Sequence, residues 1–428
     1  MLSHRAKRSL SWLSGHPSAE PGYPNGVLEM DKAENWLVRP DVLPIIKDAV
    51  SSNLKYQHLS YSQELGGPPE LLHISASFFN RFFSPQVAVL PEHIVTGTGC
   101  ASILESLIFS ICDAGDALLL EAPMWDGFAV TSTLRNNVRI IPVKYSRRPT
   151  NVADFIRHYN DAMEQATCPI RGIIVCNPHN PLGQIYPTPW LEALLQFCEN
   201  HKIHFISDEI YALSNFGAIR ASQNVSKPSI VIGPETTFTS VLAVDLKRLE
   251  INPARVHVAY SISKDLGSSG VRLGYLVTQS NPGIRLALAV LNRFKVSNIA
   301  SIAVAALLSN LQTLENVLNR SKSSLRMAAE VVHDFLSFHQ VSFYSPVAGC
   351  FMWARIGGEL ATEETDAELM EKLAAARVAV ASGSQYNGEP GWFRLTFALP
   401  RKDLMEGLRR IEIAMEAKRH WKPEENQL

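Results

Sequence analysis

A single lysine lies among hydroxyl side chains and close to an arginine in the stretch YSISKDLGSSGVRLG, residues 260–274. The hydroxyls of Ser261 and Ser263 can donate hydrogen bonds to an anion, and the guanidinium of Arg272 can bind phosphate oxygens with two parallel N–H groups. Lys264 lies between these groups, and a lysine amine becomes a catalyst when it forms a Schiff base with an aldehyde. The stretch therefore predicts a site for a phosphorylated aldehyde, although the start of a solvated helix has a similar pattern.

Two further segments favour the aldehyde. ISDEIY places Asp208 and Tyr211 at the C-terminal end of an apolar run, where open α/β sheets bind ligands. An aspartate there can pair with a protonated pyridine nitrogen and keep the ring an electron sink, although it also fits a helix N-cap. NPHNPLG is a turn whose Asn180 can hydrogen-bond a phenolic oxygen alongside Tyr211. Pyridoxal phosphate carries an aldehyde, a phosphate, a pyridine nitrogen and a phenolic oxygen on one ring, so the residues predict this cofactor.

Two more segments fit the same ring. TGTGCAS, residues 96–102, is a glycine-rich turn between a predicted strand and a predicted helix, so its amides can face a phosphate at the helix N-terminus. APMWDGF puts Trp125 just after the predicted strand ALLLEA, where the indole can stack on the pyridine face. A lone tryptophan is more often a core residue, so neither segment is specific by itself.

Composition favours a small-molecule substrate. The 428 residues include 40 basic and 41 acidic side chains, so net charge attracts the chain neither to nucleic acid nor to an anionic membrane. No apolar run approaches the roughly twenty residues of a membrane span. The six cysteines form no C-x-x-C pair, so we expect reduced thiols, no metal site and a cytoplasmic location. The basic start, MLSHRAKRSLSWLSGH, resembles a mitochondrial transit peptide, but a short basic arm is the commoner case.

Seven short apolar runs alternate with longer amphipathic segments between about residues 91 and 275. The runs are HIVTG, ALLLEA, VRIIPV, GIIVCN, HFISDE, VHVAYS and GYLVT. Continuous apolar runs indicate strands buried on both faces, so the pattern predicts a mostly parallel central sheet between helices, an α/β fold. Candidate helices between these strands include ASILESLIFSICDAG and PWLEALLQFCENH.

The rest of the chain predicts a smaller α/β layer. It has a long helical region over 299–339, strands near 350–355, 378–381 and 392–398, and a helix over 402–419. A weakly periodic loop between residues 211 and 255 fits a lid or a surface insertion. The predicted division is an N-terminal arm over 1–24, the first part of the small domain over 25–60, the large cofactor-binding domain over 61–298, and the C-terminal small domain over 299–428.

In this order and at these spacings the segments resemble the class I/II aminotransferase family of fold type I pyridoxal-phosphate enzymes. The motif S-x-S-K-D-x-x-x-x-G-x-R-x-G, over 261–274, is highly specific. The chain also resembles the 1-aminocyclopropane-1-carboxylate synthase branch and its fungal relatives, through KAEN at 32–35, SKDLG at 263–267 and EPGWFR at 389–394. The resemblance covers roughly residues 25 to 415.

The resemblance implies a set of cofactor contacts. Lys264 carries the Schiff base, Asp208 pairs with the pyridine nitrogen, and Asp208, Tyr211 and Lys264 are the catalytic residues. The remaining cofactor contacts that the resemblance implies are Asn180 and Tyr211 at the phenolic oxygen, Trp125 on the ring face, and Ser261, Ser263, Arg272 and the turn at Cys100 and Ala101 around the phosphate.

For the substrate, the resemblance implies that Arg394 binds the α-carboxylate, that Asn180 lies beside it, and that Glu34 lines the pocket. The chain departs from the synthases in two places. A tyrosine that reaches the partner subunit's cofactor is replaced at its aligned position by Leu65, and Tyr61, four residues upstream, is the candidate substitute. The phosphate turn reads G-C-A where the synthases have G-A-T. Since the family builds its sites across a two-fold interface, we expect a homodimer.

The expected chemistry begins with an amino acid displacing Lys264, after which the freed amine removes the Cα proton. The motifs leave the next step open. We favour elimination or replacement at a sulfur-bearing amino acid, S-adenosylmethionine or a cysteine conjugate, because of Glu34 and EPGWFR. The alternatives are an aminotransferase with a keto-acid acceptor and a regulator that uses this fold as a sensor.

Overall fold

A computed structural model describes residues 2–3, 6–7, 9–10, 26–62, 64–145, 149–219 and 237–422. Most of the predicted arm over 1–24 and the middle of the predicted loop between residues 211 and 255 lie outside the described residues. Within the described part, no helix is long and apolar enough to cross a membrane.

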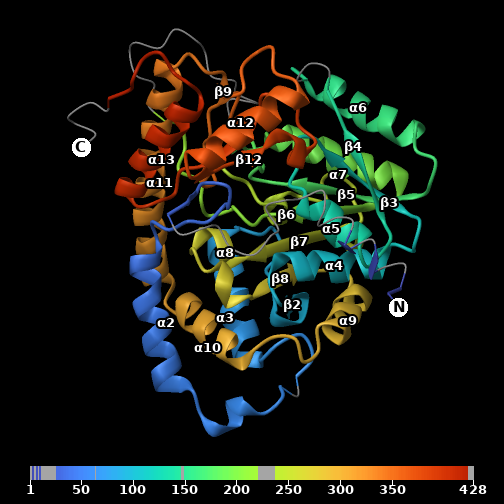
Figure 1. The fold of residues 1–428 in the computed structure, drawn as a ribbon. Coiled ribbons are helices and arrows are strands. Elements are labelled where there is room, and N and C mark those ends of the chain that lie inside the picture. Colours follow the sequence, from blue (N-terminus) through green and yellow to red (C-terminus); the bar gives the residue numbers. More distant parts are fainter. Residues whose placement is uncertain are drawn as a thin grey trace.

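The centre of the molecule is a seven-stranded sheet (Figure 1). Its strands in spatial order are β2 (Ile94–Gly97), β8 (Gly274–Val277), β7 (Val256–Ser261), β6 (His204–Asp208), β5 (Ile170–Cys176), β3 (Ala117–Glu121) and β4 (Arg139–Val143). β8 runs antiparallel to both of its neighbours, β2 and β7, and the other neighbouring pairs of this sheet are parallel. The seven predicted strands and the mostly parallel sheet are therefore confirmed.

Alternate residues of each central strand enter two different cores. On β3, Leu118 and Leu120 join one core and Leu119 joins the other, because successive strand residues point to opposite faces. Helices on the first face are α4 (Cys100–Ile111), α5 (Gly127–Thr133) and α9 (Pro282–Leu291). Helices on the second face are α3 (Pro69–Phe82), α6 (Val152–Glu164), α7 (Thr188–His201) and α10 (Asn298–Ser309). Every strand is thus covered on both sides.

A smaller layer lies at one end of the central sheet (Figure 1). Its antiparallel sheet has the order β12 (Ala381–Ser382), β13 (Phe393–Thr396), β10 (Phe351–Ala354) and β9 (Phe343–Tyr344). Its helices are α11 (Leu311–Phe338), α12 (Glu363–Ala375) and α13 (Arg401–Ala414). Near the other end of the sequence, β1 (Leu28–Glu29) pairs with β11 (Val378–Ala379) and precedes α2 (Arg39–Asn53). The predicted domain boundaries, near residues 60 and 298, stay a prediction.

The helical region predicted over 299–339 is two helices, α10 and α11, that meet at Asn310. The Asn310 side chain accepts a hydrogen bond from the Thr313 amide at 3.0 Å. This is N-cap geometry, which offers the backbone an alternative to a continuous helix. The final helix ends at Ala414 rather than near residue 419. Element types were therefore predicted better than element ends.

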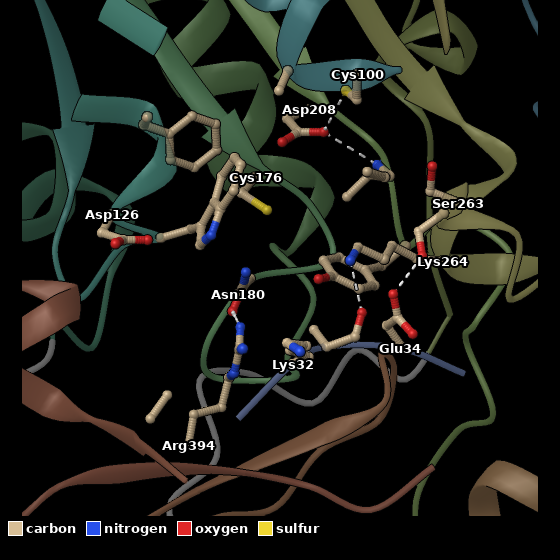
Figure 2. A pocket seen from close by; sticks show the side chains of 18 of the residues that line it. Lys32, Glu34, Cys100, Asp126, Cys176, Asn180, Asp208, Ser263, Lys264 and Arg394 are labelled. Atoms are coloured by element: carbon tan, nitrogen blue, oxygen red, sulfur yellow. Dashed lines mark hydrogen bonds between the residues drawn. The ribbon is translucent and has the colours of Figure 1, made fainter. Parts of the chain in front are cut away.

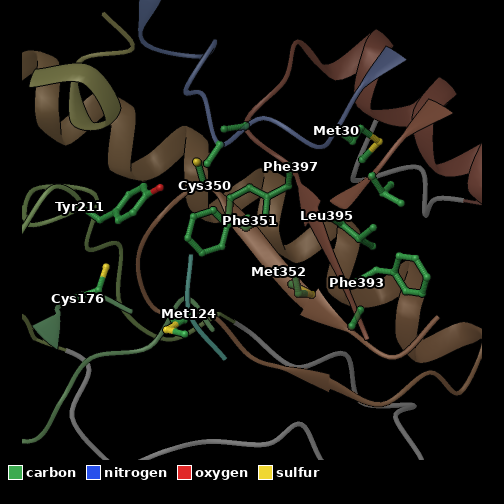
Figure 3. Packing of buried hydrophobic residues seen from close by; sticks show 14 of the residues in the cluster. Met30, Met124, Cys176, Tyr211, Cys350, Phe351, Met352, Phe393, Leu395 and Phe397 are labelled. Carbon is green, nitrogen blue, oxygen red and sulfur yellow. The ribbon is translucent and has the colours of Figure 1, made fainter. Parts of the chain in front are cut away.

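The first core continues from the central sheet into the smaller layer (Figure 3). Tyr211, which follows β6, packs edge-on against Phe351 of β10, with ring centroids 5.2 Å apart. Phe393 and Leu395 of β13 belong to the same core. The two layers therefore share buried apolar surface directly behind the cavity described next.

Candidate active site

A cavity of about 440 Å³ lies between the central sheet and the smaller layer. It borders the carboxyl ends of β5 and β6, where α/β sheets position ligand-binding groups. The cavity is lined by nearly all of the predicted site residues: Glu34, Cys100, Ala101, Trp125, Asn180, Asp208, Tyr211, Ser263, Lys264, Arg272 and Arg394. Figure 2 labels seven of them: Glu34, Cys100, Asn180, Asp208, Ser263, Lys264 and Arg394. Ser261 and Tyr61 are the predicted residues that do not line the cavity.

Lys264 is positioned by a short helix, α8 (Ile262–Asp265), that begins where β7 ends. Ser261 caps this helix, since its hydroxyl oxygen accepts a hydrogen bond from the Ser263 amide at 3.2 Å. The Lys264 ammonium donates to the Ala33 carbonyl at 2.7 Å. Burial lowers the pKa of Lys264, because a charged amine is less stable away from water. The neutral amine, which is the form that attacks an aldehyde or accepts a proton, is therefore more populated at Lys264 than at an exposed lysine.

Asp208 ends β6 and is only 3 % exposed. Burial raises its pKa to about 6, although hydrogen bonds from the Cys100 thiol (sulfur to oxygen, 3.5 Å) and the Ile210 amide (3.3 Å) work against this rise. Burial also holds the pKa of the Cys100 thiol well above its usual value, so the thiol stays protonated and acts as the donor. A buried carboxylate next to neutral donors fits a cationic ring N–H.

The turn before α4 and Arg272 form a cradle for an anion. Gly99, at the helix N-cap, has φ of +88°, and a Cβ there would lie 2.5 Å from Arg272 Nη2. A Cβ at Gly274 would lie 2.5 Å from the Gly99 carbonyl carbon. The Arg272 guanidinium donates to the Thr98 carbonyl at 3.0 Å and to the Ser269 carbonyl at 2.7 Å. Glycine at these positions brings a guanidinium and helix N-terminal amides together, which suits phosphate.

The two serines of the lysine motif have different surroundings. Ser263 lines the cavity, whereas Ser261 is fully buried beneath it. The Ser261 hydroxyl lies 2.7 Å from the Leu273 carbonyl, to which it donates, and 2.7 Å from the Ser263 hydroxyl. Ser261 therefore links the backbone before Lys264, at Ser263, to the backbone after Arg272, at Leu273.

Trp125 follows β3 and borders the cavity, where it packs edge-on against Phe128 at 5.4 Å between ring centroids. A Cβ on Gly127 would lie 2.2 Å from the Trp125 ring. The Trp-Asp-Gly sequence therefore allows the indole to fold back over its own chain. The glycine of APMWDGF, two residues after Trp125, is therefore the local sequence feature that indicates this ring position.

Arg394, on β13, is 4 % exposed and faces the cavity from the smaller layer. Its Nη1 donates to Asn180 Oδ1 at 3.0 Å and its Nη2 donates to the Asp31 carbonyl. The rings of Phe351 and Tyr386 each lie 5.1 Å from the guanidinium carbon. Its Nε is buried and has no hydrogen-bond partner among the described residues. The guanidinium is therefore held in place with N–H groups left for a carboxylate.

Glu34 lines the same cavity, but both of its carboxylate oxygens already have partners. Oε2 accepts from Arg39 Nη2 at 2.5 Å, and Oε1 accepts from the Ser269 hydroxyl at 2.5 Å. Burial alone would raise the pKa of Glu34, but these two hydrogen bonds lower it below its usual value. Glu34 is therefore ionised and already neutralised by Arg39.

Tyr61 lies on the surface, with 77 % of its area exposed, and packs edge-on against Phe294 at 5.3 Å. Leu65, at the aligned position, is 38 % exposed. Neither residue lines the cavity of its own chain. The predicted role of Tyr61 in a partner subunit's site stays a prediction.

Several cavity residues were missed by the sequence analysis. They include Asp31, Asp126, Cys176, Gln385 and Tyr386. Tyr386 lies in SQYNGEPGW, three residues before the motif EPGWFR, and nothing in its immediate sequence marks it as a cavity residue. It reaches the cavity because the Met124 amide donates to its carbonyl at 2.8 Å, a contact between the two layers.

Comparison with known proteins places this geometry in a family. A model of the family "Aminotransferase class I and II" matches residues 36–411. The chain is 40% identical over 430 residues to "Probable aminotransferase gliI" of Aspergillus fumigatus, covering 96% of this chain and 95% of that protein. It is 41% identical over 422 residues to "Aminotransferase verI" of Clonostachys rogersoniana, covering 97% and 93%.

More distant similarities agree with the fold and the predicted branch. "1-Aminocyclopropane-1-carboxylate synthase 9" of Arabidopsis thaliana is 28% identical over 91% of this chain and 83% of that protein. A solved aspartate aminotransferase of Thermus thermophilus, a tetra mutant, superposes with a TM-score of 0.74 at 20% identity, covering 97% of this chain and 99% of the other. The chain therefore belongs to the aminotransferase class I and II family and is a pyridoxal-phosphate-dependent enzyme of fold type I.

Proposed function

We propose that this enzyme removes the Cα proton of a sulfur-bearing amino acid and then breaks a carbon–sulfur bond of its side chain. The observation that carries this proposal is the pairing of two cations across one cavity. Lys264, whose pKa burial lowers, lies on one wall, and the guanidinium of Arg394, which is 4 % exposed, lies on the other. An amino acid held by Arg394 would present its Cα toward Lys264.

The residues around the cavity fit pyridoxal phosphate. When bound, the cofactor supplies an electron sink that stabilises negative charge at the substrate Cα. Lys264 would hold it covalently, and Asp208 would pair with its ring nitrogen. The remaining contacts that we propose are Asn180 and Tyr211 at the phenolic oxygen, Trp125 on the ring face, and Ser263, Arg272 and the amides of Cys100 and Ala101 at the phosphate, with Ser261 supporting Ser263 from below.

Arg394 would bind the substrate α-carboxylate. Its guanidinium is already oriented by Asn180 and by the Asp31 carbonyl, so little side-chain freedom is lost on binding. The freed Lys264 amine would then accept the Cα proton. Cleavage of the carbon–sulfur bond follows, and the bonding electron pair leaves with sulfur as a thiolate.

The surroundings of Glu34 favour a thioether over a sulfonium substrate. A sulfonium such as that of S-adenosylmethionine would gain most from an unpaired carboxylate, whereas Glu34 is already neutralised by Arg39. The rings of Trp125, Phe128 and Tyr386 also line the cavity and provide apolar surface for a sulfur substituent. We therefore place a cysteine conjugate ahead of S-adenosylmethionine.

Transamination is the second candidate, since gliI and verI carry the name aminotransferase. The two reactions differ in their products. Elimination from an S-substituted cysteine consumes water and releases thiol, pyruvate and ammonia in equal amounts without an acceptor. Transamination leaves the cofactor in its amine form and stops until a keto acid is added.

Product analysis with one S-substituted cysteine and no keto acid tests the proposal. We expect many equivalents of thiol and pyruvate per enzyme subunit, with the visible spectrum of the cofactor unchanged at the end. A single turnover without thiol release, restarted by a keto acid, would establish transamination instead.

We also propose a cytoplasmic homodimer. All six cysteines are free thiols, which suits a reducing compartment. Tyr56, Leu59 and Tyr61 are 95, 75 and 77 % exposed, a cluster of apolar surface that a second copy could cover. Light scattering should give twice the mass of one chain.

Complementation tests whether Tyr61 acts in the partner's site. Dimers mixed from the variants Lys264→Ala and Tyr61→Ala contain one site with both residues intact. If both single variants are inactive, random mixing should restore about a quarter of the wild-type sites. No recovery from subunits shown to exchange would exclude Tyr61 from the shared site.

A further inference from the structure

We propose that Glu34, Arg39 and Ser269 form a clasp that holds residues 31–36 against the cavity and thereby positions Arg394 and Lys264. The inference rests on the proposed function, in which these two cations act on one amino acid. In this proposal Ser269 and Arg39 are positioning residues. Glu34 binds these two residues and does not pair with a charge on the substrate.

The clasp joins the N-terminal segment to the turn that follows Lys264. Glu34 accepts from Arg39 and from Ser269, each at 2.5 Å. Arg39 also donates through Nε to the Gly267 carbonyl at 3.1 Å and stacks on the Trp36 ring with its guanidinium carbon 3.6 Å from the centroid. These contacts make the clasp a network instead of one exposed ion pair, which would contribute little.

The backbones of the two segments approach closely at Gly267. A Cβ at this glycine, which has φ of +56°, would lie 2.2 Å from the Asn35 carbonyl oxygen. On the other side, the Asn35 amide group donates to the Ser321 hydroxyl at 3.0 Å. The segment is therefore fixed immediately after Glu34 by packing as well as by hydrogen bonds.

The clasped segment presents two carbonyls to the two cations. The Ala33 carbonyl accepts from Lys264 at 2.7 Å, and the Asp31 carbonyl accepts from Arg394. Both carbonyls lie within three residues of Glu34. A shift of the segment would therefore release the guanidinium from one of its two orienting acceptors, the other being Asn180.

Ser269 also connects the clasp to the anion cradle. Its hydroxyl donates to Glu34, while its carbonyl accepts from Arg272 Nη1 at 2.7 Å. One residue thus contacts both the proposed phosphate-binding guanidinium and the segment that orients Arg394. The spacing of Glu34 and Ser269, 235 residues apart in sequence, shows that only the folded chain creates this connection.

The variant Ser269→Ala tests the clasp, and Ser268→Ala is its matched control. The neighbouring Ser268 hydroxyl donates to the Leu266 carbonyl at 2.7 Å and makes no hydrogen bond to Glu34. The measurement is the dissociation constant of a non-reacting carboxylic acid, an analogue of the amino-acid substrate without its amine. Binding is monitored through the visible absorbance of the loaded enzyme. This readout requires no turnover.

We expect Ser269→Ala to weaken acid binding about 3- to 10-fold, less than the roughly 10- to 100-fold of a directly lost hydrogen bond to a charged group, because Ser269 acts on the acid only through residues 31–36; Ser268→Ala should stay close to wild type. Glu34→Gln, which also removes the ion pair with Arg39, should weaken binding at least as much, and the double variant should be no worse than the weaker-binding single variant, because Ser269 acts through its contact with Glu34. Amide hydrogen exchange over residues 31–36 should be faster in both single variants.

Three results would overturn the clasp. They are wild-type acid binding in Ser269→Ala, fully additive effects in the double variant, and a Glu34→Gln defect confined to sulfonium substrates. The experiments can disprove the clasp and the proposed reaction independently of each other. If the wild-type enzyme releases no thiol while acid binding still depends on Ser269, the reaction is wrong and the clasp stands.

Discussion

Asp265 accepts a hydrogen bond from the Leu213 amide at 3.0 Å, so the residue after Lys264 is tied to the segment that follows Tyr211. The same carboxylate accepts from the Tyr260 hydroxyl at 3.2 Å and from the Ser214 hydroxyl. It is 1 % exposed. One buried side chain therefore sets the spacing between the lysine and the tyrosine of the cavity.

Asp265→Ala should destabilise the enzyme by about 2–4 kcal/mol, because it leaves buried donors without an acceptor. The measurement is the thermal unfolding midpoint of the loaded enzyme. The control is Asp48→Ala, at an exposed carboxylate on α2. Equal midpoints for the two variants would show that Asp265 does not brace the site.

Stability should depend on pH through two buried carboxylates. Burial raises the pKa of Asp265 and that of Glu209 to about 7, so the fold favours their protonated forms. Their contribution to the free energy of unfolding is fully present below the pKa of an unfolded carboxyl, about 4, and is lost as pH rises through about 7. Asp265→Asn removes one of these titrations.

We therefore expect the gap in unfolding midpoint between wild type and Asp265→Asn to narrow as pH rises from 5 to 8. Differential scanning at several pH values measures this gap. His204 and His257, whose pKa values burial lowers to about 4 and about 3, act on the midpoint of each protein in the opposite direction, since their contribution is lost as pH falls below 6.5, but they are present in both proteins and cancel in the gap. A gap that does not vary with pH would contradict the titration of Asp265.

Lys264→Ala should abolish the covalent attachment of the cofactor. Borohydride reduction of the wild-type enzyme should place the modification on the peptide containing Lys264, because a Schiff base needs a primary amine. Mass spectrometry of the digested protein measures this. Lys32→Ala, at the other lysine of the cavity lining, should keep the modification on Lys264. Finding the adduct on another lysine would remove Lys264 from its role.

Asp208→Asn should retain part of the cofactor but lose most turnover, because a neutral amide does not hold a proton on the ring nitrogen. The measurements are the cofactor content and kcat. Glu209→Gln is the matched control, since this neighbouring acid bonds to Ser207 and Ser240, away from the cavity. It should lower the unfolding midpoint and leave kcat nearly unchanged. Near-normal turnover in Asp208→Asn would exclude the proposed pairing.

Arg394→Leu should weaken every amino-acid substrate by about 2–4 kcal/mol in kcat/KM, because each carries the α-carboxylate that the guanidinium binds. Arg355→Leu is the control, since Arg355 pairs with Glu359 at 2.7 Å outside the cavity. Steady-state kinetics with several amino acids test the prediction. A loss restricted to one side-chain type would place Arg394 at the side chain and not at the carboxylate.

The strands, the mostly parallel sheet and the family could all be predicted from the amino-acid sequence. Apolar runs such as GIIVCN and VHVAYS have the length and continuity of strands buried on both faces, which is a local property of the chain. The lysine motif is also local. Ser261, Lys264 and Arg272 lie within residues 261–272, so their types and spacing fitted a phosphorylated aldehyde as well as a helix start, and the distant segments around Asp208 and Asn180 then favoured the aldehyde.

In contrast, the set of side chains that meet in the cavity and the contacts of each one depend on tertiary packing. Arg394 Nη1 meets Asn180 across 214 residues, and Ser269 meets Glu34 across 235. Such contacts depend on how the smaller layer packs on the central sheet, and that packing leaves no local pattern in the sequence. For the same reason the sequence indicated that Glu34 lines the pocket, whereas only the fold showed that Arg39 already neutralises its charge.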